Sequence, residues 1–364
     1  MPAISWSRMA KFHQCQRKYG LSYIEELERN PSAERRAPML GSAFHEGVAA
    51  YLKSPDHDIR DAINTARAYV LKALEENILL LDANNNFTTD YDYYNMVTEL
   101  QPTVLKMLEF YLPRLGIDTE WRVATMSELF PTRGFGIEGS LQRVVEKEFE
   151  IEYGGYTFKG IVDAVLVNLA DDELVMVDWK TRAKFPQDAL VHIDGQLPFY
   201  AALHNHIGAN IKSVAMWQFL TSTPKPAVML KSGQPSRDKK KLGATTWEAW
   251  SSTLPLPHKP EKYEAEFRPL MGSIERFIYT AWDEITDRSS SIALRNAVST
   301  AKAIDAAHIM YKSGMPLPAV LSSMGCQFCE FQALCEAPLK FGFPPDDIVV
   351  ARYRRKEHGT NKGK

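Results

Sequence analysis

The segment ELVMVDWKT, residues 173–181, places the strongest constraint on the fold of this chain. Four consecutive apolar residues are followed abruptly by a charged residue, an aromatic residue and a second charged residue. A short apolar run of this kind is typical of a strand that is buried on both faces. Because side chains alternate along a strand, Asp178 and Lys180 are expected to lie on the same face.

Two further strands are expected just before this one. Residues 137–152 alternate in polarity and carry β-branched residues, and residues 156–168, YTFKGIVDAVLVN, also have a strand pattern. A glycine pair and an aspartate pair between the segments are turn signals. Pairing of the last two strands would bring Asp163 beside Asp178. Two carboxylates and the ammonium group of Lys180 would then meet at one end of an antiparallel meander.

This set of charges suits the hydrolysis of a phosphodiester bond. Carboxylates hold a hard divalent cation such as Mg²⁺ or Mn²⁺, which stabilises developing charge and lowers the pKa of a water molecule. A lysine beside them can orient that water and neutralise charge on the phosphate. A salt bridge at the end of a strand is the alternative interpretation of Asp178 and Lys180.

Helical patterns surround these strands. Helices are expected over residues 1–29, 41–52, 58–81, 91–115, 195–206, 246–252 and 260–312, with a further strand over 212–220 and a mobile polar loop over 231–245. The pattern predicts an α/β or α+β fold with a small mixed sheet flanked by helices. We expect one domain, 1–364, made of N-terminal helices (1–45), a helical insertion (46–133), a core (134–222), a helical region with cysteines (223–345) and a basic tail (346–364).

Composition and charge add weaker constraints. Hydrophobic residues make up 45% of the chain and charged residues 24%, which is ordinary for a globular protein. No apolar run is long enough to span a bilayer and the start has no apolar leader, so we expect no membrane partner and a cytoplasmic location. The net charge of −2 does not indicate a nucleic-acid binder. The cluster Lys239, Lys240 and Lys241 is nevertheless a candidate DNA-binding loop, with solvated surface as the alternative.

Four cysteines occur at positions 15, 326, 329 and 335. Disulfides are rare in the cytoplasm, and four thiolates suit zinc or an iron–sulfur cluster. Zinc sites usually pair two C-x-x-C knuckles. Here a single C-x-x-C, Cys326 to Cys329, is followed by a third cysteine after a longer spacing, at Cys335. The fourth cysteine, Cys15, lies near the other end of the chain. The residues alone leave zinc and unliganded thiols open.

The order of four short motifs resembles the RecB-like branch of the PD-(D/E)XK nucleases. That family shows a glycine-and-histidine motif, then G-x-x-D, D-x-K-T and Q-x-x-x-Y. The corresponding segments here are GSAFH (41–45), GIVD (160–163), DWKT (178–181) and QLPFY (196–200). The VEKEF segment (145–149) also resembles the family's acidic strand ahead of G-x-x-D, and Glu146 matches the family glutamate better than Glu148 does.

The resemblance implies a restriction-endonuclease-like core and roles for individual residues. The implied metal ligands for Mg²⁺ or Mn²⁺ are His45, Asp163, Asp178 and the backbone carbonyl of Trp179. Lys180 would position the attacking water. Gln196 and Tyr200 lie four residues apart on one helix face, where they would contact DNA or brace the site.

The one-plus-three spacing of the cysteines resembles the iron-staple nucleases, which include AddB and the four-cysteine CRISPR-associated nucleases. In that group a [4Fe–4S] cluster joins the chain ends around the nuclease core. The resemblance therefore implies that Cys15, Cys326, Cys329 and Cys335 hold such a cluster. Because the link would close a very long loop, we expect its role to be structural.

These observations predict a metal-dependent DNA nuclease, with a single-strand exonuclease in recombination, repair, phage or CRISPR-related processing as the expected form. No G-x-x-x-x-G-K-[ST] phosphate loop occurs in the sequence, so a motor such as a helicase would be a separate partner. Two alternatives belong to other classes: a non-catalytic DNA-binding or assembly protein, and a zinc-stabilised enzyme acting on RNA. The intact set of Asp163, Asp178 and Lys180 favours catalysis.

Overall fold

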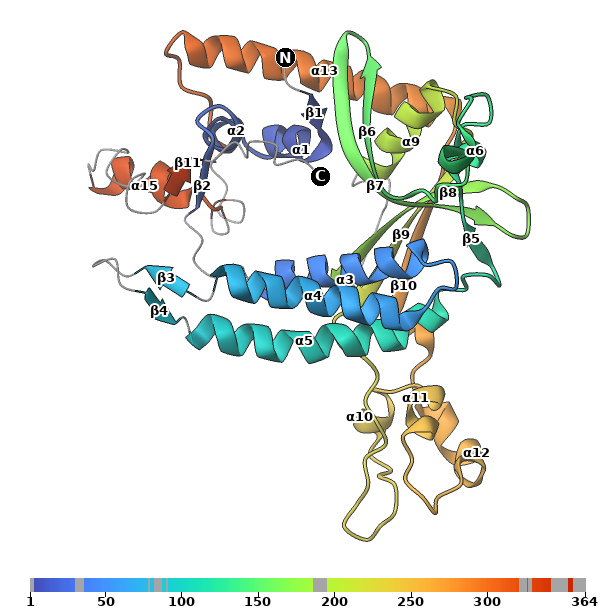
Figure 1. Cartoon of the computed structure of the whole chain (residues 1–364). Coiled ribbons are helices and arrows are strands. Elements are labelled where there is room, and N and C mark those ends of the chain that lie inside the picture. Colours follow the sequence, from blue (N-terminus) through green and yellow to red (C-terminus); the bar gives the residue numbers. More distant parts are fainter. Residues whose placement is uncertain are drawn as a thin grey trace.

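A seven-stranded mixed sheet with helices on both faces forms the centre of the molecule (Figure 1). The computed structural model describes residues 3–29, 36–77, 79–81, 87–89, 91–185, 195–320, 326, 329–341 and 353–355. The α/β class with a mixed sheet flanked by helices, predicted from the sequence, is confirmed. No helix within these ranges is both long enough and apolar enough to cross a membrane.

The sheet is built around the three-stranded meander that the sequence predicts. Its strands are β1 (Ile4–Ser5), β5 (Trp121–Val123), β6 (Val145–Tyr153), β7 (Tyr156–Asn168), β8 (Leu174–Arg182), β9 (Ile211–Leu220) and β10 (Ile278–Glu284). The main order is β1-β7-β8-β9-β10, and β5 and β6 also pair with β7. The pairs β1/β7 and β8/β9 are parallel, and the other pairs are antiparallel.

Two helical layers cover the sheet. On one face lie α1 (Trp6–Gln14), α9 (Gln196–His206) and α13 (Asp287–Lys312), which share a hydrophobic core. On the other face lie α3 (Arg36–Lys53), α4 (Ile59–Asn77) and α5 (Tyr91–Tyr111), whose core includes the buried ring of Trp179 on β8. Each face of β8 is therefore buried, as its apolar run requires.

The two ends of the described chain pack against each other. Here α2 (Gln16–Tyr23) and β2 (Leu27–Arg29) meet α15 (Gln332–Phe341) and β11 (Tyr353–Arg355), and β2 pairs antiparallel with β11 (Figure 1). Leu21, Leu27, Phe331, Leu334 and Tyr353 form a small separate core.

A small lobe projects between β9 and β10 (Figure 1). It contains α10 (Lys239–Leu242), α11 (Trp247–Ser252) and α12 (Glu264–Phe267), with short 3₁₀ turns at Pro260–Lys262, Arg268–Leu270 and Ile274–Arg276. Leu242, Trp250 and Phe267 form its core. The expected mobile loop over 231–245 is therefore partly ordered secondary structure, since Leu242 anchors the turn that carries the lysine cluster.

The remaining described elements are short: β3 (Leu79–Leu81), β4 (Phe87–Thr89), the 3₁₀ turn Leu112–Arg114, α6 (Met126–Leu129) and α7 (Ile137–Ser140). The expected helical insertion over 46–133 thus also contains three short strands among its described residues. Residues 137–140, expected to begin a strand, form a helical turn. The expected single helix over 1–29 is split at Cys15, whose extended backbone (φ −168°, ψ 116°) ends α1 and begins α2.

The clearest error of the sequence reading is the helix expected over 260–312. Residues 278–284 form β10, which pairs along its whole length with β9. Phe277, Ala281 and Ile285 recur at helical spacing, and the aromatic Tyr279 and Trp282 are exposed rather than alternating with the core. The sheet thus takes β1, β5 and β10 from outside the expected core interval 134–222.

Candidate active site

Asp163 and Asp178 lie side by side on adjacent strands. The β7/β8 ladder pairs Ala164 with Val177, so the next position along each strand places the two aspartates together. The amide of Trp179 donates a hydrogen bond of 3.2 Å to Oδ2 of Asp163. The pairing expected across the turn therefore occurs, and it delivers both carboxylates to one point of the sheet.

Lys180 and Asp178 form an ion pair of 2.7 Å between Nζ and Oδ1. Asp178 is only 3% exposed, and its second oxygen, Oδ2, is buried with no hydrogen-bond partner among the described residues. A buried, unpartnered carboxylate oxygen is costly unless something else binds it. The ion pair thus accounts for Oδ1 of Asp178 but not for Oδ2. A bound cation fits the position beside Oδ2.

His45 reaches the aspartates from α3, on a different layer. Its Nδ1 lies 3.6 Å from Oδ2 of Asp163, and its ring centroid lies 5.7 Å from that of Trp179. Gly41, one turn earlier on α3, permits this approach, because a Cβ there would lie 3.3 Å from Oγ1 of Thr181. The glycine-and-histidine motif and the D-x-K-T strand therefore pack directly against each other.

Glu146 completes the group of potential ligands. One ligand atom each from His45, Glu146 and Asp163 lies within 4.8 Å of the others. Glu146 has a left-handed backbone, with φ of 48°, between regular ladder positions of β6. Non-glycine residues rarely adopt this conformation, and such strain is often found at functional sites. The preference for Glu146 over Glu148 agrees with this placement, although the sequence did not assign Glu146 a metal-binding role.

The electrostatics of the group favour binding of a cation. Burial and the neighbouring carboxylates raise the pKa of Asp178 to about 6 and that of Glu146 to about 7, and burial also raises the pKa of Asp163. Burial and the charge of Lys180 lower the pKa of His45 to about 4, so its imidazole is neutral at pH 7. A neutral imidazole is the form that binds a metal, and crowded carboxylates repel one another less once a cation lies among them. A divalent metal therefore fits these residues.

Gln196 and Tyr200 border the same pocket from α9. Tyr200 is buried, and burial raises its pKa to about 12, with a hydrogen bond from Gln196 opposing the change. A Cβ at Gly160 would lie 2.4 Å from Oη of Tyr200, so the glycine of the GIVD segment makes room for this tyrosine. Tyr200 is thus placed to brace β7 beside Asp163.

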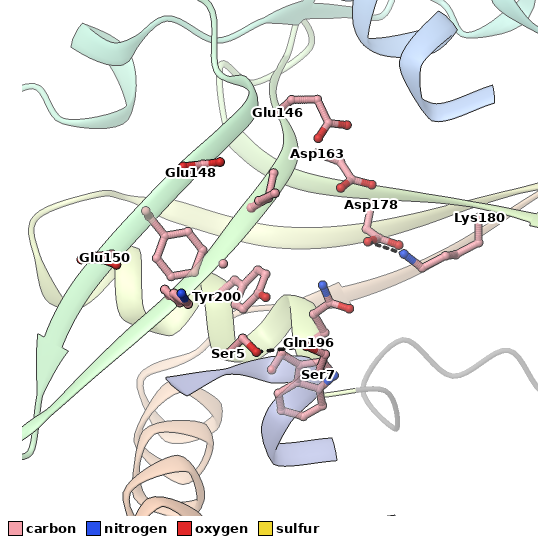
Figure 2. A pocket seen from close by; sticks show the side chains of 15 residues that line it. Ser5, Ser7, Glu146, Glu148, Glu150, Asp163, Asp178, Lys180, Gln196 and Tyr200 are labelled. Carbon is pink, nitrogen blue, oxygen red and sulfur yellow. Dashed lines mark hydrogen bonds and ion pairs between the residues drawn. The ribbon is translucent and has the colours of Figure 1, made fainter. Parts of the chain in front are cut away.

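The pocket itself measures about 690 Å³ and is lined by residues of the sheet and of the helical layer that contains α1 and α9. Figure 2 shows Glu146, Asp163, Asp178 and Lys180 on one side, and Gln196, Tyr200, Ser5 and Ser7 on another. Ser5 ends β1 and caps α1, and Trp6 and Ser7 belong to the first turn of α1. The sequence analysis missed this wall, because a two-residue strand such as β1 has no detectable pattern.

The four cysteines lie near one another where the chain ends meet. Burial raises the pKa of Cys335, and the charges of Cys329, Cys15 and Cys326 act in the same direction. The amide of Lys18 donates to Sγ of Cys15 at 3.5 Å, so this cysteine caps α2. Cys15 and the C-terminal trio thus lie in the region where the chain ends pack, and their role as cluster ligands stays a prediction.

The lysine cluster lies on the lobe rather than in the catalytic pocket. Lys239, Lys240 and Lys241 are exposed on α10, which is capped by Asp238. The lobe begins where β9 ends, beside β8: Lys180 pairs with Gln218, and the amide of Thr221 donates to Arg182 at 2.8 Å. The segment that carries the lysine cluster thus leaves β9 a few residues after Gln218, the residue that pairs with Lys180.

Comparisons with known proteins agree with this geometry. No curated protein matches the chain. Among solved structures, the crystal structure of SSO0001 is similar at 15% sequence identity and a TM-score of 0.24, over 67% of this chain and 80% of that chain, which is too distant to carry an argument. The family model of the PD-(D/E)XK nuclease superfamily matches residues 3–336, nearly the whole chain, including both aspartates, Lys180, His45 and all four cysteines. This chain therefore belongs to the PD-(D/E)XK nuclease superfamily.

Proposed function

We propose that this protein is a divalent-metal-dependent DNA nuclease with Asp163, Asp178 and Lys180 at its catalytic centre. The observation that carries the proposal is the buried, unpartnered Oδ2 of Asp178 beside the group formed by His45, Glu146 and Asp163. Superfamily membership supports the same assignment. We propose His45, Asp163, Asp178 and the backbone carbonyl of Trp179 as ligands for Mg²⁺ or Mn²⁺, with Glu146 as an additional ligand.

The protein's own residues have distinct tasks in such a site. A bound divalent metal would act as a Lewis acid for the phosphate and lower the pKa of a water. Lys180, held by Asp178 at 2.7 Å, is placed to orient the attacking water and to neutralise charge on the phosphate. His45 stays neutral because burial and Lys180 lower its pKa, so it offers a lone pair rather than a charge.

We further propose that the substrate is DNA with free or single-stranded ends, cut as an exonuclease in the cytoplasm. The expected partner is a separate helicase or a recombination, repair, phage or CRISPR protein. The pocket supports a strand substrate, because its walls come from α1, β6, β7, β8 and α9 and leave a shared open space of about 690 Å³. Gln196 and Tyr200 would border the bound strand there.

A cleavage assay tests the proposed activity. End-labelled single-stranded DNA should be degraded with Mg²⁺ or Mn²⁺ and spared with EDTA. Replacing Lys180 with alanine should lower the rate by about 10²–10⁴, the range typical of a lost proton-transfer or electrostatic group. Glu148→Gln is the matched control, since Glu148 lines the pocket outside the ligand group. DNA binding without metal-dependent cleavage would instead favour the non-catalytic alternative, and cleavage of RNA alone would contradict DNA as substrate.

We also propose that Cys15, Cys326, Cys329 and Cys335 bind one [4Fe–4S] cluster that ties the chain ends together. The position of Cys15 between α1 and α2 supports this, as does the packing of α2 against α15. Protein purified without oxygen should contain about four irons per chain. Cys15→Ser should lose this iron and become less stable, because the closure needs all four ligands. One zinc with no iron would refute the cluster, and full iron content in Cys15→Ser would refute the staple.

A further inference from the structure

A second cavity adjoins the catalytic pocket, and one side chain lines both. The cavity measures about 360 Å³ and lies between α1, the start of α9 and the first half of α13. That volume falls within the range of roughly 300–1,000 Å³ typical of small-molecule sites. Trp6 belongs to the walls of this cavity and of the catalytic pocket alike. We name it the Trp6 cavity.

The indole of Trp6 is held in place from several directions. Its ring centroid lies 5.9 Å from that of Phe199. Gly195, with φ of 70°, begins α9 next to it, and a Cβ there would lie 2.7 Å from Cη2 of the indole. The backbone of Trp6 lies close enough to Tyr200 in the catalytic pocket to oppose the rise in the pKa of that tyrosine. Trp6 is only half-buried, so part of this fixed aromatic surface remains open to a ligand.

The chemistry of the lining distinguishes between possible ligands. Met9, Phe199, Ile292 and Ala293 supply apolar surface together with Trp6. The described residues that line the cavity include no lysine or arginine, and Asp283 contributes a carboxylate. His13 is the one lining side chain among them that can take up a positive charge, and its Nε2 lies 2.8 Å from Oγ1 of Thr300. A phosphate would therefore find no permanent cation and one like charge here. A flat aromatic group with hydrogen-bonding edges fits instead.

A nucleobase has both properties. Its faces can stack on an indole, and base–aromatic stacking is the general means by which proteins hold single strands. Its amino groups can donate to a carboxylate, and an asparagine amide can pair with adenine. Asn296 offers such an amide in the Trp6 cavity, and the carboxylate of Asp283, which also interacts within the protein, belongs to the same lining.

We propose that the Trp6 cavity binds an unpaired nucleobase of the DNA strand that is being cut. The inference rests on the proposed nuclease function and specifies its substrate. Because Trp6 lines both spaces, a strand whose base occupies this cavity would continue past Trp6 into the pocket that holds Asp163 and Asp178. A paired base must first leave its stack, which costs a few kcal/mol. The cavity therefore selects single-stranded or frayed ends.

Binding to synthetic DNA without cleavage tests the proposal. The probe is a short single-stranded oligonucleotide in EDTA, compared with versions that carry one abasic site at each position in turn. The expected result is that one abasic position weakens binding to the wild type by about five- to a hundredfold, the range for one base–aromatic stack, while its neighbours have little effect. Trp6→Leu should bind every oligonucleotide alike, and Trp6→Phe should keep the preference.

Two isoleucines on α13 provide a matched pair of variants. Ile292 lines the cavity, and Ile309 lies on the same helix outside it; both are exposed, by 43% and 70%. Ile292→Asp should remove the abasic effect, because it replaces apolar surface of the cavity with a charged group, and Ile309→Asp should leave it unchanged. Since both side chains are exposed, both variants should fold.

Each result decides the matter. No position-dependent abasic effect in the wild type overturns the proposal, as does an equal loss in Ile292→Asp and Ile309→Asp. If either of these results is found while Mn²⁺-dependent cleavage is intact, the base site is refuted and the nuclease function is not. Absence of both DNA binding and cleavage refutes the two together. Binding of an apolar peptide or an alkyl chain in the cavity, without any abasic effect, would assign the cavity to another class of ligand. That result would also refute the proposal.

Discussion

Replacing Asp178 with asparagine should make the metal-free protein more stable while it destroys cleavage. Asp178 is 3% exposed, and its Oδ2 has no partner among the residues described. Burial and the charge of Asp163 raise its pKa from 3.8 to about 6, and Lys180 only partly opposes them. Asparagine keeps the shape and can still accept the Lys180 hydrogen bond, but it removes one of the crowded negative charges.

The size and pH dependence of the effect follow from the pKa. Each pKa unit corresponds to about 1.4 kcal/mol, so the change from 3.8 to about 6 amounts to up to roughly 3 kcal/mol. Because the pKa of the folded state is the higher one, the folded protein keeps the Asp178 proton after the unfolded chain has lost it. Wild-type stability should therefore fall as the pH rises from about 4 through about 6. The variant lacks this group, so its advantage should be near zero at pH 4 and greatest at pH 8.

Urea unfolding in EDTA at pH 4.5, 6 and 8 measures this difference, with cleavage in Mn²⁺ followed in parallel. Glu148→Gln serves as the control, because it removes a pocket carboxylate outside the ligand group. Adding Mn²⁺ should stabilise the wild type more than the variant, since a metal stabilises the state that binds it. A variant less stable than the wild type at pH 8 without metal, or one that cleaves at the wild-type rate, would refute the reasoning.

Three further predictions follow from single features. His45→Ala should raise the concentration of metal needed for half-maximal cleavage by at least about tenfold, and Mn²⁺ should restore more activity than Mg²⁺. If the metal titration is unchanged, His45 is not a metal ligand. Gly160→Ala should cost about 1–3 kcal/mol in urea unfolding, because the new Cβ meets Tyr200, whereas exposed Ile161→Ala should cost little. Changing Lys239, Lys240 and Lys241 together to alanine should weaken DNA binding and flatten its dependence on salt, without affecting metal binding; an unchanged salt slope would make this cluster solvated surface.

The strands nearest the site were predictable because their signals are local. The apolar run before Asp178 has the length of a strand, and alternation alone places Lys180 on the same face. The turn between residues 168 and 174 is short enough that only antiparallel pairing is possible, which brings Asp163 alongside. The helix at 196–206 was also predicted, and most of its side chains are buried.

Elements at the edge of the sheet were not predictable in the same way. β10 lies at the end of the main order of strands, with Tyr279 and Trp282 exposed, so its residues do not show the alternation of a half-buried strand. Its strand conformation depends on hydrogen bonds to β9, more than fifty residues earlier in the chain. The two-residue β1 depends in the same way on pairing with β7.

The central strands, the pair of aspartates and the lysine that follows could be predicted, because strand period and short turns are properties of neighbouring residues. Which other groups reach these residues depends on tertiary contacts. The docking of α3 on β8 carries His45 to Asp163, the irregular backbone of β6 turns Glu146 toward both, and the start of α1 closes the pocket with Trp6. These contacts join segments of chain far apart in sequence, and they exist because the helices must bury their apolar faces against the two sides of one sheet.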